Sequence, residues 1–295
     1  MDSHSSRSLK DRVVVITGSA RGMGRAYAHG FLAAGAKVVA TDRSWTGVEP
    51  LSPELTQSGK NLLAADMDIT DEAQIDRVCG AALERFGTID ALINNAAMRQ
   101  RDLFPPTGRI TTLETKDSDW EKSFGVNVFG TLKVIRRFIK PMIEQRRGSI
   151  VNAVSSGILN HSSGGAYMAL RPDSREMPYQ SAKAALTTLS FYLANEVAEH
   201  NVAVNVVIPG HTRTTGFDEQ NRARMSANRP TGPQPLVPEH IVPIVLHLAA
   251  QDASSITGRM FDVMQWNLEH GFGGHDAWVD KSFSYEALKR GDSIT

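Results

Sequence analysis

The chain has 295 residues, of which 41% are hydrophobic and 22% charged, and its 32 basic side chains balance 32 acidic ones. This composition is typical of a globular protein and excludes the basic footprint of nucleic-acid-binding proteins. A single cysteine, Cys79, excludes an intrachain disulfide, and no apolar run is long enough to span a membrane. Residues 1–9 are serine-rich and lack the apolar core of a secretory signal, so we expect a flexible tail there, followed by one cytoplasmic domain.

Short apolar runs alternate with longer amphipathic stretches along the chain. The runs that predict strands are residues 12–17, 37–41, 61–65, 89–94, 149–154, 202–208 and 259–264. Helical spacing of apolar residues predicts helices over residues 23–34, 71–86, 117–145, 179–200 and 238–250. Strands this apolar are typical of a parallel sheet that is buried on both faces. The pattern therefore predicts an α/β fold, a single-domain, Rossmann-like, doubly wound parallel sheet of about seven strands with helices on both faces.

The first strand runs directly into a glycine-rich turn, Thr17-Gly18-Ser19-Ala20-Arg21-Gly22-Met23-Gly24, and then into a helix. Glycines at this spacing permit a tight turn, close approach of the backbone to a pyrophosphate, and close helix packing. The helix N-terminus adds unpaired amides and the positive end of the helix dipole. Glycines that merely end a strand are the alternative, but the strand before and the helix after favour a nucleotide-binding turn.

Asp42 ends the second predicted strand, where a dinucleotide would place its adenosine ribose. A carboxylate there accepts hydrogen bonds from the ribose hydroxyls and repels a 2′-phosphate, which favours NAD over NADP. Arg21 and Arg43 favour the opposite choice, because an arginine accommodates that phosphate. We give the fixed carboxylate more weight than the mobile arginines and expect NAD. A turn-forming aspartate is the alternative for Asp42.

The segment Tyr179-Gln180-Ser181-Ala182-Lys183 places a phenol and an ammonium on one face of a predicted helix, one turn apart. A tyrosine pKa lies near 10, and a lysine charge held close favours the phenolate. Lowering that pKa by roughly three units takes about 4 kcal/mol, which a lysine in a dry site and a positively charged cofactor ring could supply. The pair therefore predicts a proton-transfer site, and a chance surface pair is the alternative.

In combination, these segments resemble the short-chain dehydrogenase/reductase family from about residue 12 to residue 264. The motifs that carry the resemblance are the glycine turn (TGxxxGxG), Asp68-Ile69, Asn94-Asn95-Ala96-Ala97 (NNAG, with alanine for glycine), Asn127, Ser155-Ser156, Tyr179 with Lys183 (YxxxK), and Pro209-Gly210 with Thr214 (PGxxxT). Seven motifs occur in the family's order, each at the expected end of a strand or helix.

The resemblance implies an oxidoreductase that transfers a hydride between NAD(H) and a small secondary alcohol or ketone. Tyr179 would be the general acid/base and Ser156, which the usual alignment selects, would hydrogen-bond the substrate oxygen. Lys183 would tune Tyr179 and bond the nicotinamide ribose, and Asn127 would hold a water that links Lys183 to solvent. The implied cofactor-binding residues are Gly18, Ala20, Arg21, Gly22, Met23, Asp42, Arg43, Asp68, Ile69, Asn95, Ala96, Tyr179, Lys183, Pro209, Gly210, Thr212 and Thr214. A homotetramer, or a homodimer, is the implied assembly.

Three segments depart from the family's pattern. Residues 157–178 separate Ser156 from Tyr179 and contain an insertion with a rival pair, Tyr167 and Arg171, which we reject because arginine does not give up its proton and Pro172 ends any helix there. Residues 211–237 occupy the place of a substrate flap, and their arginines hint at a substrate anion. Residues 265–295 form a C-terminal extension whose aromatic residues we expect to cross a subunit boundary or close over the cleft.

The nine histidines show no metal-binding spacing, and we expect no catalytic metal. Two alternatives to the predicted NAD-dependent enzyme remain open. One is an NADP-dependent ketone reductase of the same fold. The other is a non-catalytic dinucleotide-sensing regulator, which would have no need of a tuned phenol.

Overall fold

The structure is a computed structural model, and it describes residues 8–48, 51, 59–105, 110–161 and 177–291. Its sheet consists of β1 (Val13–Thr17), β2 (Lys37–Asp42), β3 (Leu62–Asp66), β4 (Ala91–Asn94), β5 (Gly148–Ala153), β6 (Val202–Ile208) and β7 (Met260–Asp262). The strand order is β3-β2-β1-β4-β5-β6-β7, and every neighbouring pair is parallel. The predicted doubly wound, seven-stranded α/β sheet is thereby confirmed.

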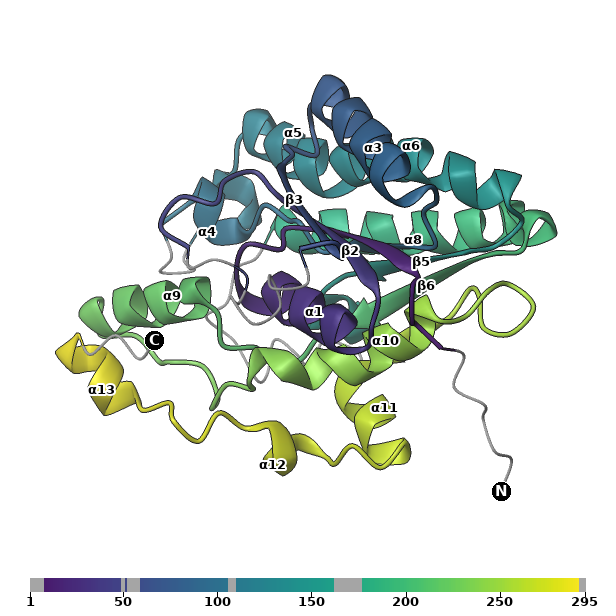
Figure 1. The fold of residues 1–295 in the computed structure, drawn as a ribbon. Coiled ribbons are helices and arrows are strands. Elements are labelled where there is room, and N and C mark those ends of the chain that lie inside the picture. Colours follow the sequence, from purple (N-terminus) through teal and green to yellow (C-terminus); the bar gives the residue numbers. More distant parts are fainter. Residues whose placement is uncertain (1–7, 49–50, 52–58, 106–109, 162–176, 292–295) are drawn as a thin grey trace.

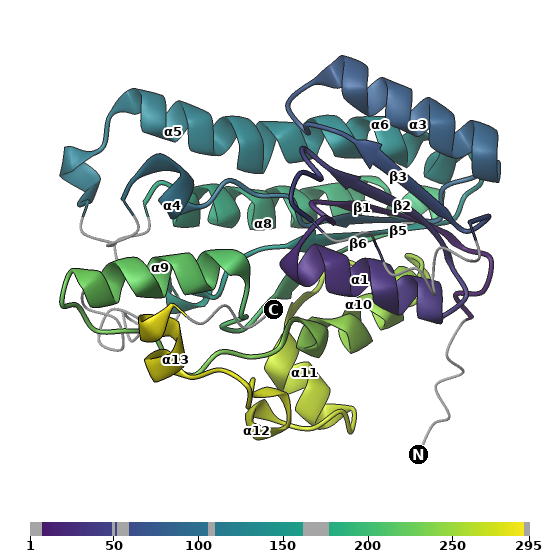
Figure 2. The same ribbon diagram turned by 60° about the vertical axis from the view of Figure 1, so that its left-hand side comes forward.

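Helices cover both faces of this sheet (Figure 1, Figure 2). On one side lie α1 (Gly22–Ala33), η5 (Pro238–Ile241), α10 (Val242–Ala249) and α11 (Val263–Glu269). On the other side lie α3 (Glu72–Phe86), α5 (Asp117–Phe124), α6 (Thr131–Glu144) and α8 (Tyr179–Glu196). The remaining helical segments are α4 (Gln100–Leu103), η1 (Thr112–Glu114), η2 (Gly125–Gly130), η3 (Ser156–His161), η4 (Ala198–His200), α9 (Thr215–Ser226), α12 (His275–Trp278) and α13 (Tyr285–Arg290).

The core is split by the sheet because successive strand side chains point to opposite faces. Val14 and Ile16 of β1 pack with Phe31 of α1 in one cluster. Leu92 of β4 packs with Phe138 of α6 in the other. Both phenylalanines are completely buried, and each burial contributes about 1.5–3 kcal/mol to stability. The strands are apolar on both faces because helices cover the sheet on both sides.

The order of strands reverses between β1 and β4, which is where doubly wound sheets open a ligand crevice at their carboxyl ends. Asn95 follows β4 and closes the base of this crevice. Its side-chain amide donates to the carbonyls of Thr17 (3.1 Å) and Gly18 (2.9 Å), and its backbone N–H donates to the Thr17 hydroxyl (3.0 Å). The NNAA segment therefore binds the glycine turn to the neighbouring strand.

Helix ends carry residue types that commonly start and stop helices. The Asp71 carboxylate caps α3 by accepting the Gln74 N–H (3.1 Å), and this bond lowers the pKa of Asp71. Gly87 ends the same helix in the left-handed conformation (φ 79°), and Gly35 follows α1 with φ 80°.

Two predicted elements differ in the structure. The helix predicted over residues 117–145 is divided by a π-helical turn, η2, between α5 and α6. The strand predicted over residues 259–264 is limited to β7, because the Asp262 carboxylate accepts the N–H groups of Met264 and Gln265 (both 3.0 Å) and thereby starts α11.

Five α-helices were not expected from the sequence: α4, α9, α11, α12 and α13. Among them, α9 lies inside the predicted flap, residues 211–237. Its apolar residues are sparse, so its period is weak, and it starts where the Thr214 hydroxyl accepts the Phe217 N–H (3.2 Å). A cap of this kind needs no apolar pattern.

The ends and the insertion are described only in part. Of the predicted tail at residues 1–9, the structure describes Ser8 and Leu9, and Leu9 is buried in the core beside α1. Residues 162–176 of the insertion, including Tyr167 and Arg171, lie outside the described residues. In the part of the chain that is described, none of the helices has the length and apolar character needed to cross a bilayer.

Candidate active site

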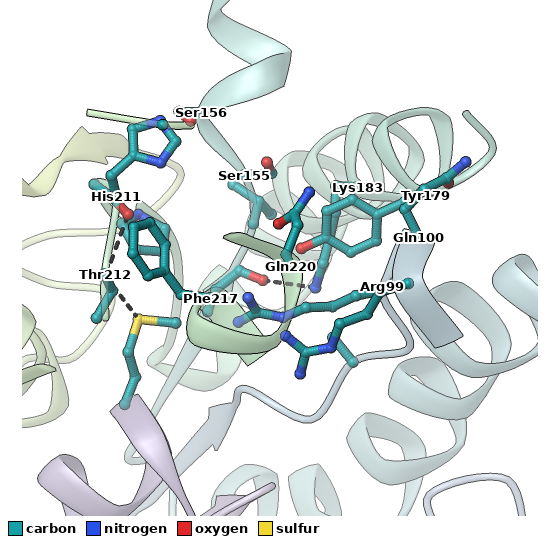
Figure 3. Close-up of a pocket in the computed structure, with 18 of the residues that line it drawn as sticks. Arg99, Gln100, Ser155, Ser156, Tyr179, Lys183, His211, Thr212, Phe217 and Gln220 are labelled. Carbon is teal, nitrogen blue, oxygen red and sulfur yellow. Dashed lines mark hydrogen bonds between the residues drawn. The ribbon is translucent and has the colours of Figure 1, made fainter. Parts of the chain in front are cut away.

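Tyr179 and Lys183 enter one cavity from the first turns of α8 (Figure 3). The helix begins at Tyr179, and Pro178 is its N-cap residue. The Lys183 ammonium lies 5.9 Å from the centre of the Tyr179 ring and donates to the Ala153 carbonyl at the end of β5 (2.9 Å). The helical spacing thus brings phenol and ammonium together as predicted.

The Lys183 side chain is buried, with 2% of the residue exposed. Burial, and after it the positive charge of Arg99, lowers the pKa of Lys183 to about 7. In the protein alone this amine is therefore only partly protonated at neutral pH. A negative charge placed nearby would restore its proton, so Lys183 responds to the charge of its neighbours.

The cavity around Tyr179 has a volume of about 160 Å³. Its wall combines the ends of three strands with one face of α9. The residues beside Tyr179 and Lys183 include Ser155 and Ser156 after β5, Pro209, Gly210, His211 and Thr212 after β6, and Phe217, Gln220, Asn221 and Arg224 of α9. The α9 residues were not predicted as site residues because the helix itself was not, although the flap was expected to face the substrate.

Both serines of the predicted pair line this cavity. In Figure 3, Ser156 lies beside His211, on the far side from Tyr179, and Ser155 lies nearer to the Tyr179 ring. The family resemblance selects Ser156, whereas Ser155 is the serine that lies nearer to Tyr179 in the structure.

Asn127 is completely buried in the π-helical turn η2. Its side-chain oxygen accepts the Met98 N–H (3.1 Å), and its amide donates to the Met98 carbonyl (2.8 Å) and the Ser123 hydroxyl (3.3 Å). Both ends of the amide are thus used to hold the segment that follows β4. Arg99, the residue after Met98, lines the cavity with Tyr179, so Asn127 positions one wall of the site.

A second, longer cavity of about 640 Å³ runs along the carboxyl ends of β1, β2 and β4. Most of the predicted cofactor-binding residues line it: Gly18, Arg21, Gly22, Met23, Asp42, Arg43, Asp68, Ile69, Asn95, Ala96 and Thr214. Pro209, Gly210 and Thr212 line the Tyr179 cavity instead. Ala20 lines neither cavity, and its N–H donates to the Asp42 carboxylate (2.9 Å).

The glycine turn leaves no room for side chains. A Cβ on Gly18, whose φ is 68°, would lie 2.8 Å from the Ala96 Cα, and one on Gly24 would lie 2.0 Å from the Gly18 carbonyl oxygen. The N-cap residue of α1, Arg21, makes no capping hydrogen bond with its side chain. The first backbone N–H groups of the helix are therefore not used by such a cap. These features fit a pyrophosphate at the start of α1.

Charged groups line this cavity at the carboxyl end of β2. Asp42 accepts hydrogen bonds from the backbone N–H groups of Ala20 (2.9 Å) and Ser44 (3.4 Å), so its carboxylate is held in place. Arg43 lines the cavity. Arg21 lines it too, but its guanidinium donates to the Thr46 carbonyl (2.7 Å).

The two cavities share a wall made of Met23, Asn95, Ala97, Arg99 and Arg101. Arg101 packs on the backbone of α9, since a Cβ on Gly216 would lie 1.0 Å from its guanidinium. Burial, and after it the charge of Arg99, lowers the pKa of Arg101. Arg99 and Arg101, in the segment that follows β4, thus lie in the wall between the two cavities.

No cluster of three or more potential metal ligands occurs among the residues that the structure describes. The prediction that catalysis uses no metal stays a prediction.

Comparison with known proteins gives a consistent assignment. The sequence model of the short chain dehydrogenase family matches residues 12–225. A fluoren-9-ol dehydrogenase from a Terrabacter species is 52% identical over 269 residues, which cover 91% of this chain and 75% of that protein. The subunit BbsD of a (2S)-[(R)-hydroxy(phenyl)methyl]succinyl-CoA dehydrogenase from Thauera aromatica is 32% identical, over 86% of this chain and 96% of its own length.

Solved structures agree on the fold. Levodione reductase aligns with a TM-score of 0.69 at 25% identity, over 86% of this chain and 96% of its own. A 3-ketoacyl-(acyl-carrier-protein) reductase from Brucella melitensis, complexed with NADH, aligns with a TM-score of 0.69 at 27% identity, over 87% of this chain and 98% of its own.

Proposed function

The chain belongs to the short-chain dehydrogenase family, and from this premise we propose that it is an NAD-dependent oxidoreductase that interconverts a secondary alcohol and its ketone. One observation carries the proposal. The cavity that holds Tyr179 and Lys183 shares a wall with the longer cavity that begins at the glycine turn. A dinucleotide whose pyrophosphate lies at that turn therefore reaches the phenol with its nicotinamide end.

The proton chemistry is assigned to Tyr179. In the direction of alcohol oxidation, its phenolate accepts the proton of the substrate hydroxyl, and a hydroxyl of Ser156 or Ser155 donates a hydrogen bond to the same oxygen. A bound nicotinamide ring supplies the acceptor for the hydride from the carbinol carbon. In the direction of ketone reduction, Tyr179 returns the proton.

We assign to Lys183 the role of favouring the Tyr179 phenolate. Its ammonium is held 5.9 Å from the ring in a buried position, where opposite charges attract more strongly than in water. The same attraction works in reverse, because a Tyr179 phenolate favours the protonated lysine. The protonation states of the two groups are therefore coupled.

The preference for NAD is assigned to Asp42. The backbone N–H groups of Ala20 and Ser44 hold its carboxylate at the cavity edge, so a 2′-phosphate there meets a fixed negative charge. Arg21, the arginine next to the turn, is bonded to the Thr46 carbonyl instead. Arg43 remains at the cavity as the residue that would favour NADP.

The proposed substrate class is a ring alcohol of aromatic character. The name of the 52% identical relative specifies fluoren-9-ol, in which the carbinol carbon lies between two fused aromatic rings. Phe217 and Met23 provide apolar surface in the Tyr179 cavity, which suits an aromatic ring.

A panel of secondary alcohols tests this function. Fluoren-9-ol, 1-phenylethanol, cyclohexanol and lactate are each supplied with NAD or NADP, and formation of the reduced cofactor is followed by its absorbance. We expect turnover of the aromatic alcohols with NAD, at kcat/KM values about tenfold or more above those with NADP. Tight cofactor binding without turnover of any alcohol or ketone would favour the dinucleotide-sensing alternative.

We also propose an assembly of several subunits, a homotetramer or a homodimer, through the face formed by α8 and η2. This face exposes three large side chains: Phe129 (57% exposed), Phe191 (38%) and Tyr192 (71%). Because α8 and η2 are in contact, these exposed aromatic groups on neighbouring elements favour a protein interface. Sedimentation of the wild type should show a particle of two or four chains, and Tyr192→Glu with Phe129→Glu should reduce it to smaller species. A wild-type monomer would contradict this assembly.

The cytoplasmic location stays a prediction from the sequence.

A further inference from the structure

The C-terminal extension packs against the flap that carries the substrate-facing helix α9. In Figure 1 and Figure 2, α13 lies beside α9. The backbone joins them first: Leu236 of the flap pairs with Val279, the Val237 N–H donates to the Trp278 carbonyl (2.9 Å), and the Asp280 N–H donates to the Pro235 carbonyl (2.8 Å). Residues 278–290, here called the tail strap, thus run along the outer edge of the flap.

Arg213 connects the tail strap to the start of α9 by charge. Its guanidinium lies 2.9 Å from the Asp280 carboxylate and 3.3 Å from the Asp218 carboxylate. The side chains of Arg213 and Asp280 are only 11% and 9% exposed. Ion pairs with this little solvent are screened less than surface pairs.

Aromatic contacts reinforce the same junction. The Phe283 ring, in a residue 5% exposed, meets the Phe217 ring edge to face with centres 5.6 Å apart. Arg213 covers the Phe283 ring at 5.1 Å, and the Tyr285 ring lies 4.7 Å from it. The Tyr285 hydroxyl donates to the Gly232 carbonyl (2.7 Å). Phe283 is therefore the centre of a small core between tail strap and flap.

Phe217 is the link between this core and the chemistry. It lines the Tyr179 cavity, and Phe283 packs against it. A further contact of α9 is with Arg101, whose guanidinium packs on Gly216. The helix is thus held between the tail strap and the wall that both cavities share.

We propose that the tail strap sets the size of substrate that this enzyme accepts, with Phe283 and Asp280 as positioning residues that hold Phe217 against the catalytic cavity. This inference rests on the proposed function. With Phe283 in place, the Phe217 ring is fixed and can pack on a small aromatic alcohol. Without it, Phe217 can withdraw into the vacated space, a small alcohol loses that contact, and a tricyclic alcohol fills the wider cavity.

The test compares Phe283→Ala with a matched control in the same extension, Phe272→Ala. Phe272 stacks on Trp266, at 5.6 Å, and is 47% exposed. Steady-state kinetics use saturating NAD with 1-phenylethanol or fluoren-9-ol. For Phe283→Ala we expect KM for 1-phenylethanol to rise about tenfold while kcat and KM for NAD change by less than about twofold. The preference for fluoren-9-ol over 1-phenylethanol should rise by about the same factor as KM for 1-phenylethanol.

Phe272→Ala should leave that preference unchanged. Asp280→Asn, which keeps the size of the side chain and removes its charge, should move it in the same direction as Phe283→Ala, by about threefold. If Phe283→Ala does not fold, Phe283→Leu replaces it, with an expected shift between those of the wild type and Asp280→Asn. An unchanged preference in folded Phe283 variants would overturn the inference.

Hydrogen exchange of residues 215–226 provides a readout that does not depend on turnover. Exchange there should accelerate about tenfold in Phe283→Ala and not in Phe272→Ala. If the wild-type protein oxidises no alcohol, the proposed function fails, but hydrogen exchange still tests the role of the tail strap. Equal exchange of residues 215–226 in the wild type and in all variants would show that the tail strap does not hold α9.

Discussion

Replacing Tyr179 by phenylalanine is expected to lower kcat for alcohol oxidation about 10²- to 10⁴-fold, the range that a positioned general acid/base contributes. The substitution removes one oxygen atom and leaves the ring that packs above Lys183. Because the ring remains, affinity for NADH should stay within about twofold of wild type. Stopped-flow or steady-state absorbance of the reduced cofactor measures the rate, and calorimetry with NADH measures the affinity.

The matched control is Tyr192→Phe. Tyr192 lies on the same helix, α8, but is 71% exposed and is absent from both cavities. This variant should keep wild-type kcat. Equal activity of Tyr179→Phe and Tyr192→Phe would remove Tyr179 from the mechanism, whereas loss of NADH binding in Tyr179→Phe would point to a binding role instead of a chemical one.

Replacing Asp42 is expected to reverse the cofactor preference. Two hydrogen bonds from ribose hydroxyls to a carboxylate contribute about 1.5–3 kcal/mol each, and the fixed charge opposes a 2′-phosphate. A total change of roughly 3 kcal/mol corresponds to a shift of about 10²-fold in the ratio of kcat/KM for NAD to kcat/KM for NADP. Asp42→Asn removes the charge but keeps an oxygen that accepts the Ala20 N–H. This variant therefore separates the effect of the charge from the effect of losing the hydrogen bond to the glycine turn.

Asp66→Asn is the control for Asp42→Asn. Asp66 ends the neighbouring strand, pairs in register with Asp42 and is exposed. Its replacement should leave the ratio unchanged. If Asp42→Asn and Asp42→Ala both leave the preference where it was, the carboxylate does not select the cofactor, and Arg43 becomes the residue to vary.

The sequence alone predicted the family, the strands of the sheet and the Tyr179–Lys183 pair, because each leaves a local pattern or motif in the chain. Apolar strands with two buried faces indicate a parallel sheet, and β6 was predicted at its observed bounds. The glycine turn sits between β1 and α1, and a spacing of four residues within α8 brings Tyr179 and Lys183 to one cavity. The spacing of residues along the chain is sufficient to predict features that lie within one element or between two consecutive elements.

Other features were decided by contacts between distant segments. The π-helical turn at Asn127 is bonded to Met98 after β4, and the pattern of apolar residues, which would be the same for an unbroken helix, does not reveal it. The position of Arg99 beside Lys183 depends on the meeting of β4 and α8.

The C-terminal extension shows the same limit most clearly. Its aromatic residues indicated in advance that it packs somewhere, and we expected a subunit boundary or the cleft. The structure places Phe283 on Phe217, 66 positions earlier in the chain, through Arg213, Asp218 and Asp280. A local pattern specifies which face of an element is apolar, whereas the choice of partner for that face depends on the shape of the whole chain, and tertiary packing alone makes that choice.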